Sequence, residues 1–302
     1  MPRYIDPVTD FGFKRIFSEA SVLRGFINAV LAPGEAVEEL DYLATEIVGD
    51  GPQGRVVIFD LRCRTRDGRT FVVEVQRLPQ PYFKRRTLYY AMRNFEEQVQ
   101  RGDREYAMTP VVVIAVVDYD LPGDYEGYRH RFTLRSDRGE PFSDVLALYF
   151  VELSKLPMTA TAPELDPLDQ WARAIRDMSS LDGIPDWVTE SDIKRAFEVA
   201  EEAGLSAEER VAWYRALRED RDLRGQVLQQ YIHGKEEGRE EGREEGREEG
   251  REEGREEGRE EGREEGRERT IRQAVAAGLD PQEAQRLFGL SAEELAELLA
   301  RD

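Results

Sequence analysis

Apolar residues in the first half of the chain switch between helical and strand spacing. Over residues 10–31 they recur at intervals of three and four, which predicts a helix. Its apolar face consists of Phe13, Phe17, Ala20, Phe26 with Ile27, and Val30. Thr9 or Asp10 can cap the start of this helix, and Pro33-Gly34 ends it.

The following segment has the spacing of strands and then of a second helix. We expect strands at residues 39–48, 55–66 and 69–76, with the last two joined at Asp67-Gly68. Helical spacing returns at residues 82–101, before Gly102. The residues predicted to form the core face of this second helix are Leu88, Met92, Phe95 and Val99.

The run PVVVIAVV at residues 110–117 is apolar throughout, which is typical of a strand buried on both faces. Further strands are predicted at 128–135 and 145–153, and a linker from Pro157 to Pro167 precedes helices over 168–232. Three tryptophans are expected in the core of that helical segment: Trp171, Trp187 and Trp213. The order of helices and strands predicts an α/β fold with a mixed sheet flanked by helices.

Alternation fixes the register of the hairpin around residues 61–76, because side chains point alternately to the two faces of a sheet. A three-residue loop, Arg66-Asp67-Gly68, pairs Leu61 with Val73, so that apolar residues share a face. This loop favours glycine at its left-handed third position. A two-residue turn would mix the faces. The same register places Asp60 directly across from Glu74.

Directly opposed carboxylates destabilise a sheet, because their Cβ atoms are only about 4.5–5.5 Å apart. A protonated carboxyl, neighbouring arginines or a bound cation can remove the repulsion. Carboxylate oxygens together with water suit Mg²⁺, or Mn²⁺. The alternative is a solvated polar face, on which Arg62 and Arg64 are the counterions of Asp60 and Glu74.

Residues 238–265 are seven copies of Gly-Arg-Glu-Glu and contain no apolar side chain, so they have no core to bury. Each glycine costs a helix about 1 kcal/mol relative to alanine, and a period of four places like charges at i and i+4. We expect a solvated spacer, as frayed helix or disordered chain. It could set the reach of its neighbours or become helical on self-association.

The last residues, 270–302, predict three short helices with Asp280 and Ser291 as caps. This module is acidic, so it suits a protein partner better than DNA. The lone Cys63 forms no internal disulfide and suits a reducing cytoplasm. We expect no signal peptide and no membrane span, since no run of 18 apolar residues occurs.

The charge of the chain is uneven. A net charge of −20 would by itself argue against nucleic acid as a partner. However, residues 55–104 carry 12 basic and 6 acidic side chains, a net of +6, whereas residues 235–269 carry 10 basic and 17 acidic ones, a net of −7. The total therefore hides a basic patch in the segment that contains the hairpin. The two histidines, His130 and His233, are too few for a metal cluster.

Four segments follow one another in the first half of the chain: IDPVTDFGFKRIF, FDLRCRTRDGRTFVVEVQ, YFKRRTLYYAMRNFEEQVQRGDREY and PVVVIAVVDY. In this order they resemble the Rpn family of recombination-promoting nucleases and transposases, within the PD-(D/E)XK nuclease superfamily. They fall within residues 4–155, about half of the chain. The resemblance implies a restriction-endonuclease-like fold and a Mg²⁺-dependent DNA endonuclease that promotes recombination or transposition.

By the family pattern, Asp60 and Glu74 hold the metal ion, and Gln76 takes the catalytic position that is lysine in many superfamily members. An amide can orient the attacking water, but it carries no positive charge and is no base at neutral pH. Lys14 or Lys84 could supply the missing charge. The alternative is that both are surface lysines.

The second predicted helix carries one stripe of tyrosine and arginine at steps of four, three and four: Tyr82, Arg86, Tyr89 and Arg93. Cations at fixed spacing can meet phosphates, which supply most nonspecific DNA affinity. Together with the resemblance, this predicts DNA contacts by Lys84, Arg85, Arg86, Tyr89 and Arg93. The alternative is a solvated face on which arginine packs against tyrosine.

The sequence thus predicts a nuclease-like core at 1–161, a helical segment at 162–233, a repeat spacer at 234–269 and a helical module at 270–302. The leading hypothesis is a metal-dependent DNA endonuclease. Two alternatives stay open: a catalytically inactive DNA-binding protein on the same fold, and an interaction protein that works through the repeat and the C-terminal helices.

Overall fold

A computed structural model describes residues 2–48, 56–99, 107–157 and 165–300. The chain forms two compact units, Met1–Arg224 and Gly225–Asp302. The domain boundary that the sequence predicts at residue 161 lies outside the described residues, as does most of the predicted linker. The division into four segments stays a prediction.

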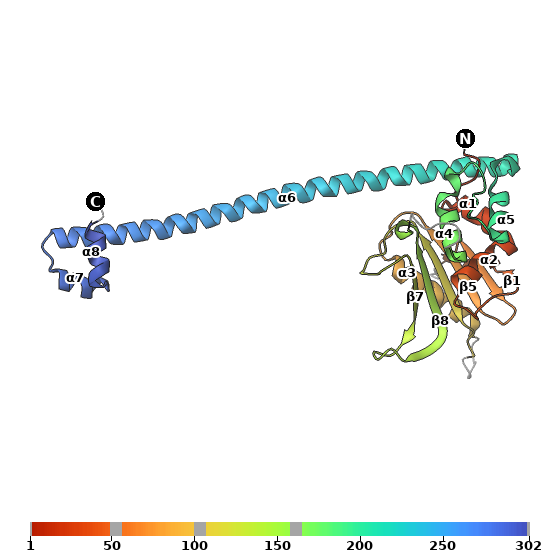
Figure 1. Cartoon of the computed structure of the whole chain (residues 1–302), viewed down its shortest axis with the longest axis horizontal. Helices are drawn as coiled ribbons and strands as arrows, with labels where there is room; N and C mark the ends of the chain where they lie inside the picture. The colour runs from red at the N-terminus through yellow and green to blue at the C-terminus, as the bar shows by residue number, and fades with distance from the viewer. Residues whose placement is uncertain (1, 49–55, 100–106, 158–164, 301–302) are drawn as a thin grey trace. The chain divides into compact units, whose positions relative to one another are not determined.

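A mixed sheet of six strands forms the centre of the first unit, in the order β1-β4-β5-β6-β8-β7 (Figure 1). The strands are β1 (Leu40–Tyr42), β4 (Leu61–Thr65), β5 (Thr70–Gln76), β6 (Val111–Val117), β7 (Arg129–Arg135) and β8 (Pro141–Glu152). β6 is parallel to both of its neighbours, and the other pairs are antiparallel. A small second sheet pairs β2 (Glu46–Val48) with β3 (Val56–Ile58). The α/β class and the mixed sheet are confirmed.

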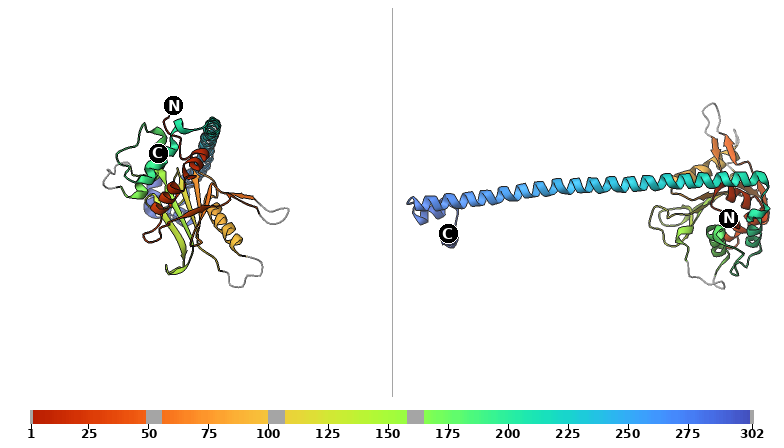
Figure 2. Two further views of the ribbon diagram at one scale, coloured as in Figure 1. Left: turned by 90° about the vertical axis from the view of Figure 1, so that its right-hand side faces the viewer. Right: turned by 90° about the horizontal axis from the view of Figure 1, so that it is seen from above.

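Helices cover both faces of the six-stranded sheet (Figures 1 and 2). The helices on one face are α1 (Asp10–Phe17), α2 (Ala20–Val30), α4 (Pro167–Asp177), α5 (Ser191–Ala200) and the start of α6 (Ala207–Ala276). The other face is covered by α3 (Phe83–Gln98). Short 3₁₀ helices are η1 (Leu153–Lys155), η3 (Met178–Ser180) and η4 (Glu202–Gly204). Because both faces are covered, every residue of β6 is buried, as its apolar sequence predicts.

The predicted core tryptophans lie in the larger of the two cores, between the sheet and the helices that include α4 and α5. Trp171 and Trp213 are fully buried there, and Trp187 is partly buried against the same core. Since Trp213 belongs to α6, the first turns of that helix are part of the first unit.

The helix predicted over residues 10–31 is two helices, α1 and α2, which are separated at Ser18-Glu19. Their main buried side chains are Phe13, Ile16 and Phe17 in α1, and Val22, Leu23, Phe26, Ile27 and Val30 in α2. The apolar stripe shifts its phase between Phe17 and Val22, which one straight helix cannot follow. Ala20, predicted on the core face, is exposed. Thr9 caps α1 as predicted, because its Oγ1 accepts a hydrogen bond from the Gly12 N–H at 3.1 Å.

The strands predicted at 39–48 and 55–66 are each divided by a bend. The register of β1 with β4 would place Glu46 opposite Phe59, but Glu46 pairs with Ile58 in the second sheet. The pairing therefore shifts by one residue, and the second strand bends at Phe59-Asp60. This shift depends on how the two sheets meet, which the apolar pattern of a single strand does not show. The predicted start of β8 is also wrong, because this strand begins at Pro141, four residues before the predicted start.

The predicted hairpin register is confirmed. Leu61 pairs with Val73 and Cys63 with Phe71. Gly68 has φ +90°, the left-handed conformation that the three-residue loop requires.

The predicted core face of α3 is wrong for Leu88 and Met92, whereas Phe95 is partly buried against the core as predicted. The buried residues of this helix are Phe83, Thr87, Tyr90, Ala91 and Asn94. By contrast, Leu88 is 39% exposed and Met92 62% exposed. The reason is Arg62, which is only 4% exposed beneath α3 and donates from Nε to Asn94 Oδ1 at 2.7 Å. A buried guanidinium needs polar partners, so the side of α3 that carries Asn94 faces the sheet.

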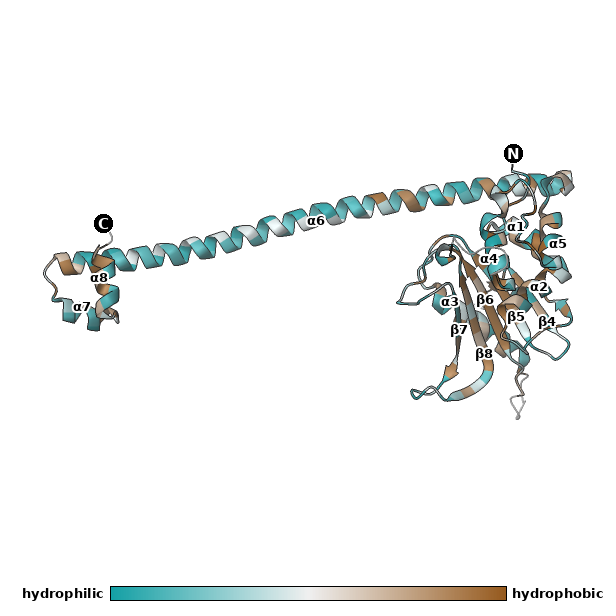
Figure 3. Ribbon diagram, in the orientation of Figure 1, coloured by the Kyte–Doolittle hydropathy of each residue, from teal (hydrophilic) through white to brown (hydrophobic). Residues whose placement is uncertain are grey.

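In the second unit, α6 continues as a helix through the Gly-Arg-Glu-Glu repeat, where every residue from 234 to 266 is exposed. Figure 3 shows the polar colouring of this part of α6. The segment is thus solvated, as predicted, and helical. No described helix, α6 included, is long and apolar enough to cross a bilayer.

The C-terminal module has a small core of its own, formed by Ile271, Ala284, Leu295 and Leu298. Its first helical part is the end of α6, followed by α7 (Pro281–Phe288) and α8 (Ala292–Ala300). The two predicted caps are confirmed. Asp280 accepts a hydrogen bond from the Gln282 N–H at 2.9 Å, and Ser291 accepts one from the Glu294 N–H at 3.2 Å.

Candidate active site

Asp60 and Glu74 hold each other through reciprocal hydrogen bonds to the main chain. The Asp60 N–H donates to Glu74 Oε1 at 3.0 Å, and the Val75 N–H donates to Asp60 Oδ2 at 2.9 Å. The paired residues of β4 and β5 end at Leu61 and Val73, so Asp60 lies in the bend just outside the ladder. The bend thus frees the Asp60 side chain to reach β5 beside Glu74.

Alternation along β5 explains why Glu74 is buried. Val73 and Val75 point to the core formed with α1 and α2, so Glu74 points to the opposite face, which α3 covers. There it is 2% exposed, and Arg62 on the neighbouring strand is 4% exposed. This face is therefore not solvated, which excludes the alternative of a polar surface. Asp60, at the end of the strand, is partly exposed.

Burial raises the pKa of both carboxyls. Burial is the main cause for Glu74, the charge of Asp60 adds to it, and together they raise its pKa to about 8. Burial also raises the pKa of Asp60, although the hydrogen bond from Val75 opposes the rise. Glu74 is consequently protonated at neutral pH in the metal-free protein, whereas an ordinary glutamic acid is ionised.

Two cations from opposite sides act on this pair. Arg86 of α3 has its Nη2 3.9 Å from Glu74 Oε2, and Lys14 of α1 lowers the pKa of both carboxyls through its charge. Lys14 Nζ also forms an ion pair with Asp10 Oδ1 at 2.7 Å, and Asp10 in turn raises the pKa of Asp60. The site therefore lies between α1 and α3. Lys14 is near the site, as expected if it supplies the charge that Gln76 lacks.

The sequence alone predicts Asp10 only as a possible helix cap and Arg86 only as a DNA contact. The spacing of Asp10 and Lys14 was a usable signal, because residues i and i+4 share one face of a helix. Nothing in the sequence indicated that Arg86 would turn inward.

The pair fits a hard divalent cation. Each carboxylate uses one oxygen for a main-chain N–H, and no protein hydrogen bond within the described residues engages Asp60 Oδ1 or Glu74 Oε2. Mg²⁺ is commonly held by one or two carboxylates and keeps several waters. No group of three or more His, Cys, Asp or Glu that could hold a metal occurs in the described part of the chain. Water would therefore complete the coordination.

Gln76 and Lys84 have different surroundings. Gln76 is the last residue of β5, two residues beyond Glu74, and its partly exposed side chain has no hydrogen-bond partner among the described residues. Lys84 is engaged elsewhere, since its Nζ donates to the Pro122 carbonyl and to Tyr125 Oη at 3.2 Å. Of the two lysines, only Lys14 is thus near the carboxylates.

The predicted DNA-contacting residues of α3 fall into two groups. Arg85 and Tyr89 are exposed, and the Tyr89 side chain is 40% exposed. Arg86 turns to Glu74 and Gln80, and Arg93 pairs with Glu96. The outer surface of α3 therefore carries fewer free cations than the sequence alone indicates.

Arg62 fixes α3 over the site. Besides Asn94, it binds the Ala44 carbonyl through Nη1 at 3.3 Å and pairs with Glu97 through Nη2. Asn94 donates in turn to the Tyr90 carbonyl at 2.8 Å. This network joins the middle of α3 to the strand that follows Asp60, and so it determines where Arg86 meets Glu74.

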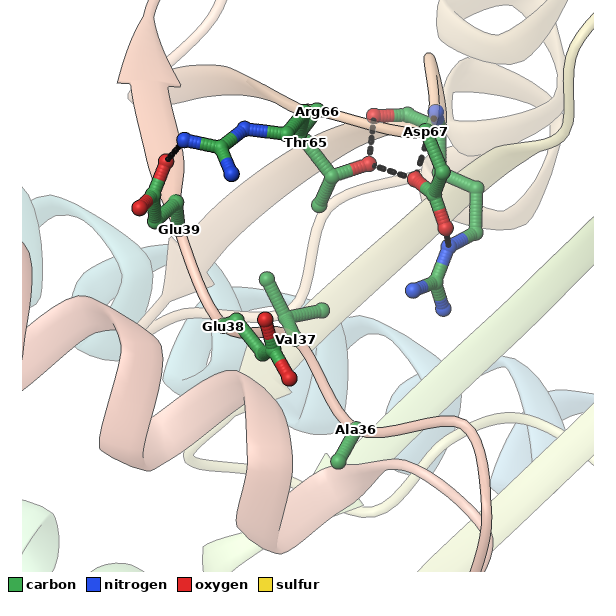
Figure 4. A pocket seen from close by; sticks show the side chains of 8 residues that line it. Ala36, Val37, Glu38, Glu39, Thr65, Arg66 and Asp67 are labelled. Atoms are coloured by element: carbon green, nitrogen blue, oxygen red, sulfur yellow. Dashed lines mark hydrogen bonds and ion pairs between the residues drawn. The ribbon is translucent and has the colours of Figure 1, made fainter.

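A separate cavity of about 350 Å³ lies at the turn of the β4–β5 hairpin, at the opposite end of these strands from the carboxylates (Figure 4). Four of its charged side chains form two ion pairs. Arg66 binds Glu39, and Arg69 Nε lies 2.8 Å from Asp67 Oδ2. This cavity has no buried, unpaired carboxylates and is a weaker candidate for chemistry.

A family model described as PD-(D/E)XK nuclease family transposase matches residues 7–229, well over half of the chain. The matched segment contains Asp60, Glu74, Gln76 and the whole of α3. No curated protein and no solved structure matches the chain.

The raised pKa of Glu74 predicts how the stability of the metal-free protein depends on pH. Between its ordinary pKa of 4.5 and about 8, Glu74 is protonated when folded and ionised when unfolded. The free energy of unfolding should therefore fall as pH rises from about 5 to 8, by a few kcal/mol at about 1.4 kcal/mol per pKa unit. Glu74→Gln stays neutral and should flatten this slope.

Urea unfolding between pH 5 and 9 in the presence of a chelator measures this slope. Glu46→Gln, which changes an exposed glutamate in β2, is the matched control and should behave like the wild type. Equal slopes for the wild type and Glu74→Gln would show that Glu74 has an ordinary pKa.

Proposed function

Because the chain belongs to the PD-(D/E)XK nuclease family transposases, we propose that it is a DNA endonuclease that requires Mg²⁺ or Mn²⁺. Asp60 and Glu74 hold the ion and Gln76 takes part in catalysis. The observation that carries this proposal is the buried pair itself. Two adjacent carboxyls whose pKa values are raised by burial, with that of Glu74 raised further by the charge of Asp60, are costly in a protein that uses them only for structure.

Asp60 and Glu74 would bind the cation through the oxygens that the main chain leaves free. A bound divalent ion lowers the pKa of a water ligand and neutralises charge on the phosphate. The N–H groups of Asp60 and Val75 fix the two carboxylates before binding, so little side-chain ordering has to occur when the ion and the substrate arrive.

Gln76 can orient a water molecule through its amide, but it supplies no charge. Lys14 and Arg86 compensate for this, since both lower the pKa of the two carboxyls and hence stabilise negative charge at the site. Positive charge at this position would stabilise the phosphate in the transition state. The missing lysine is thus replaced by cations from two helices.

The exposed side of α3 would meet the DNA backbone. Arg85 is exposed and can reach a phosphate, and Tyr89 lies one turn further along the helix. Lys84 is held by the segment around Pro122 and Tyr125, where it still adds positive charge next to Arg85.

A second candidate function is DNA binding without cleavage. It is favoured by one observation, that Gln76 stands in place of a charged residue with no partner for its amide among the described residues. Nicking of a supercoiled plasmid with Mg²⁺, with Mn²⁺ and with chelator separates the two functions, because only the endonuclease converts plasmid to open circle.

Asp60→Asn should abolish metal-dependent nicking and leave metal-free stability equal or higher. Asparagine can still accept the Val75 hydrogen bond, and it removes a negative charge beside Glu74. The variant should also lose the rise in melting temperature that Mg²⁺ gives the wild type, since binding to the folded state alone contributes about 2.7 kcal/mol at 100 times the dissociation constant.

Plasmid nicking and thermal melts on the same preparations test this, with Asp41→Asn as the control because Asp41 is an exposed strand residue of β1. The control should nick plasmid and respond to Mg²⁺ like the wild type. An Asp60→Asn protein that still cuts DNA would overturn the assignment of the site.

Arg85→Ala should weaken DNA binding and reduce the dependence of affinity on salt, because one fewer phosphate contact releases one fewer counterion. The slope of log K against log[salt] should fall in magnitude by about 1. Fluorescence anisotropy with a labelled duplex in chelator measures the slope, and Arg138→Ala, an exposed arginine in the β7–β8 turn, should leave it unchanged. An unaltered slope for Arg85→Ala would assign this face of α3 to solvent.

A further inference from the structure

Tyr82, directly before α3, has a backbone conformation that is unfavourable for tyrosine. It is the only residue other than glycine with a positive φ in the described part of the chain, at φ 69° and ψ 14°. The Phe83 N–H donates to the Gln80 carbonyl at 3.2 Å, which closes a turn with Pro81 and Tyr82 at its centre. This is a type II turn, whose third position favours glycine or asparagine.

The side chain of Tyr82 contributes nothing to the core that would explain the strain. It is 72% exposed, more than any other tyrosine of the described residues. The Arg85 guanidinium lies 5.3 Å from the centre of its ring. An exposed aromatic ring beside a cation thus occupies a position where glycine would relieve the strain of the turn. Backbone strain of this kind concentrates at functional sites.

The ring is also held close to the candidate site. The Arg86 N–H donates to the Tyr82 carbonyl at 2.9 Å, and the Arg86 side chain reaches Glu74. The connection from Gln76 to Tyr82 contains Pro79 and Pro81, whose rings fix φ. Tyr82 is therefore one helical turn away from a residue that contacts the carboxylates, on a restrained segment.

We propose that Tyr82 is a stacking platform for an unpaired base next to the phosphodiester bond to be cut, and that the substrate is DNA with a single-stranded or frayed segment. The inference rests on the proposed function and specifies its substrate. An exposed aromatic ring stacks on any base, but the bases of an intact duplex already stack on their neighbours. Arg85 beside the ring can meet the phosphate of the same nucleotide.

The turn supplies variants that separate binding from folding. Tyr82→Gly and Tyr82→Asn both suit the left-handed position and should keep or raise the melting temperature. Tyr82→Trp keeps an aromatic face. Tyr231→Ala is the control, because Tyr231 in α6 is 67% exposed and outside the first unit.

The experiment measures the dissociation constants of the full chain for a labelled 20-nucleotide single strand and for the same sequence as duplex, in chelator. Loss of one stacked base should lower the preference for the single strand about 5- to 100-fold in Tyr82→Gly and Tyr82→Asn. Tyr82→Trp and Tyr231→Ala should keep the wild-type preference. With 2-aminopurine in the single strand, the wild type should quench its fluorescence and Tyr82→Gly should not.

The outcomes distinguish this inference from the proposed function. If the wild type binds DNA and nicks plasmid, but Tyr82→Gly keeps the wild-type preference and quenching, the stacking role is wrong and the endonuclease stands. An equal loss on single strand and duplex would also overturn stacking on an unpaired base. If the wild type binds neither DNA, both proposals fail, and the exposed ring would then serve a protein partner.

Discussion

Two carboxylates, the buried Glu74 and the partly exposed Asp60, lie side by side at the end of a hairpin, and the arrangement around them depends on that constraint. Because the sheet is covered on both faces, strand alternation cannot turn Glu74 towards water. Alternation can only move the Glu74 side chain from one helical layer to the other. The bend at Phe59-Asp60 brings the second carboxylate beside it, and reciprocal main-chain hydrogen bonds hold both. Lys14 and Arg86 lower the pKa of Glu74 but do not cancel the effects of burial and of the Asp60 charge, since this pKa still lies at about 8.

Local rules were sufficient to predict the hairpin and the proximity of its two carboxylates. Only the three-residue loop places the apolar residues of both strands on the same face. The structure has that register, with Gly68 in the left-handed conformation. The proximity of Asp60 and Glu74 follows from the register, although the bend changes its form from a ladder pair to side-chain contacts with the main chain. The buried strand β6 was equally clear, because an uninterrupted apolar run suits only a strand covered on both faces.

Features that depend on long-range partners could not be predicted. Leu88 and Met92 are more apolar than Thr87 and Asn94, yet α3 buries the latter two. The choice is made by Arg62, a buried cation on another strand that needs Asn94 as an acceptor. The inward position of Arg86 follows from the same docking. Likewise, the one-residue shift between β1–β4 and β2–β3 depends on how two sheets meet, and side-chain alternation in one strand carries no record of it.

The proposed metal site requires that a divalent cation replace the proton of Glu74. Calorimetric titration of Mg²⁺ into the metal-free protein, in buffers with different ionisation enthalpies, measures the protons released. With a pKa of about 8, the wild type should release roughly one proton at pH 7 and almost none by about pH 10, because ligands must be deprotonated to bind. Glu74→Gln should release none at either pH. Binding of Mg²⁺ without proton release at pH 7, or equal release by Glu74→Gln, would contradict the exchange of the Glu74 proton for the cation.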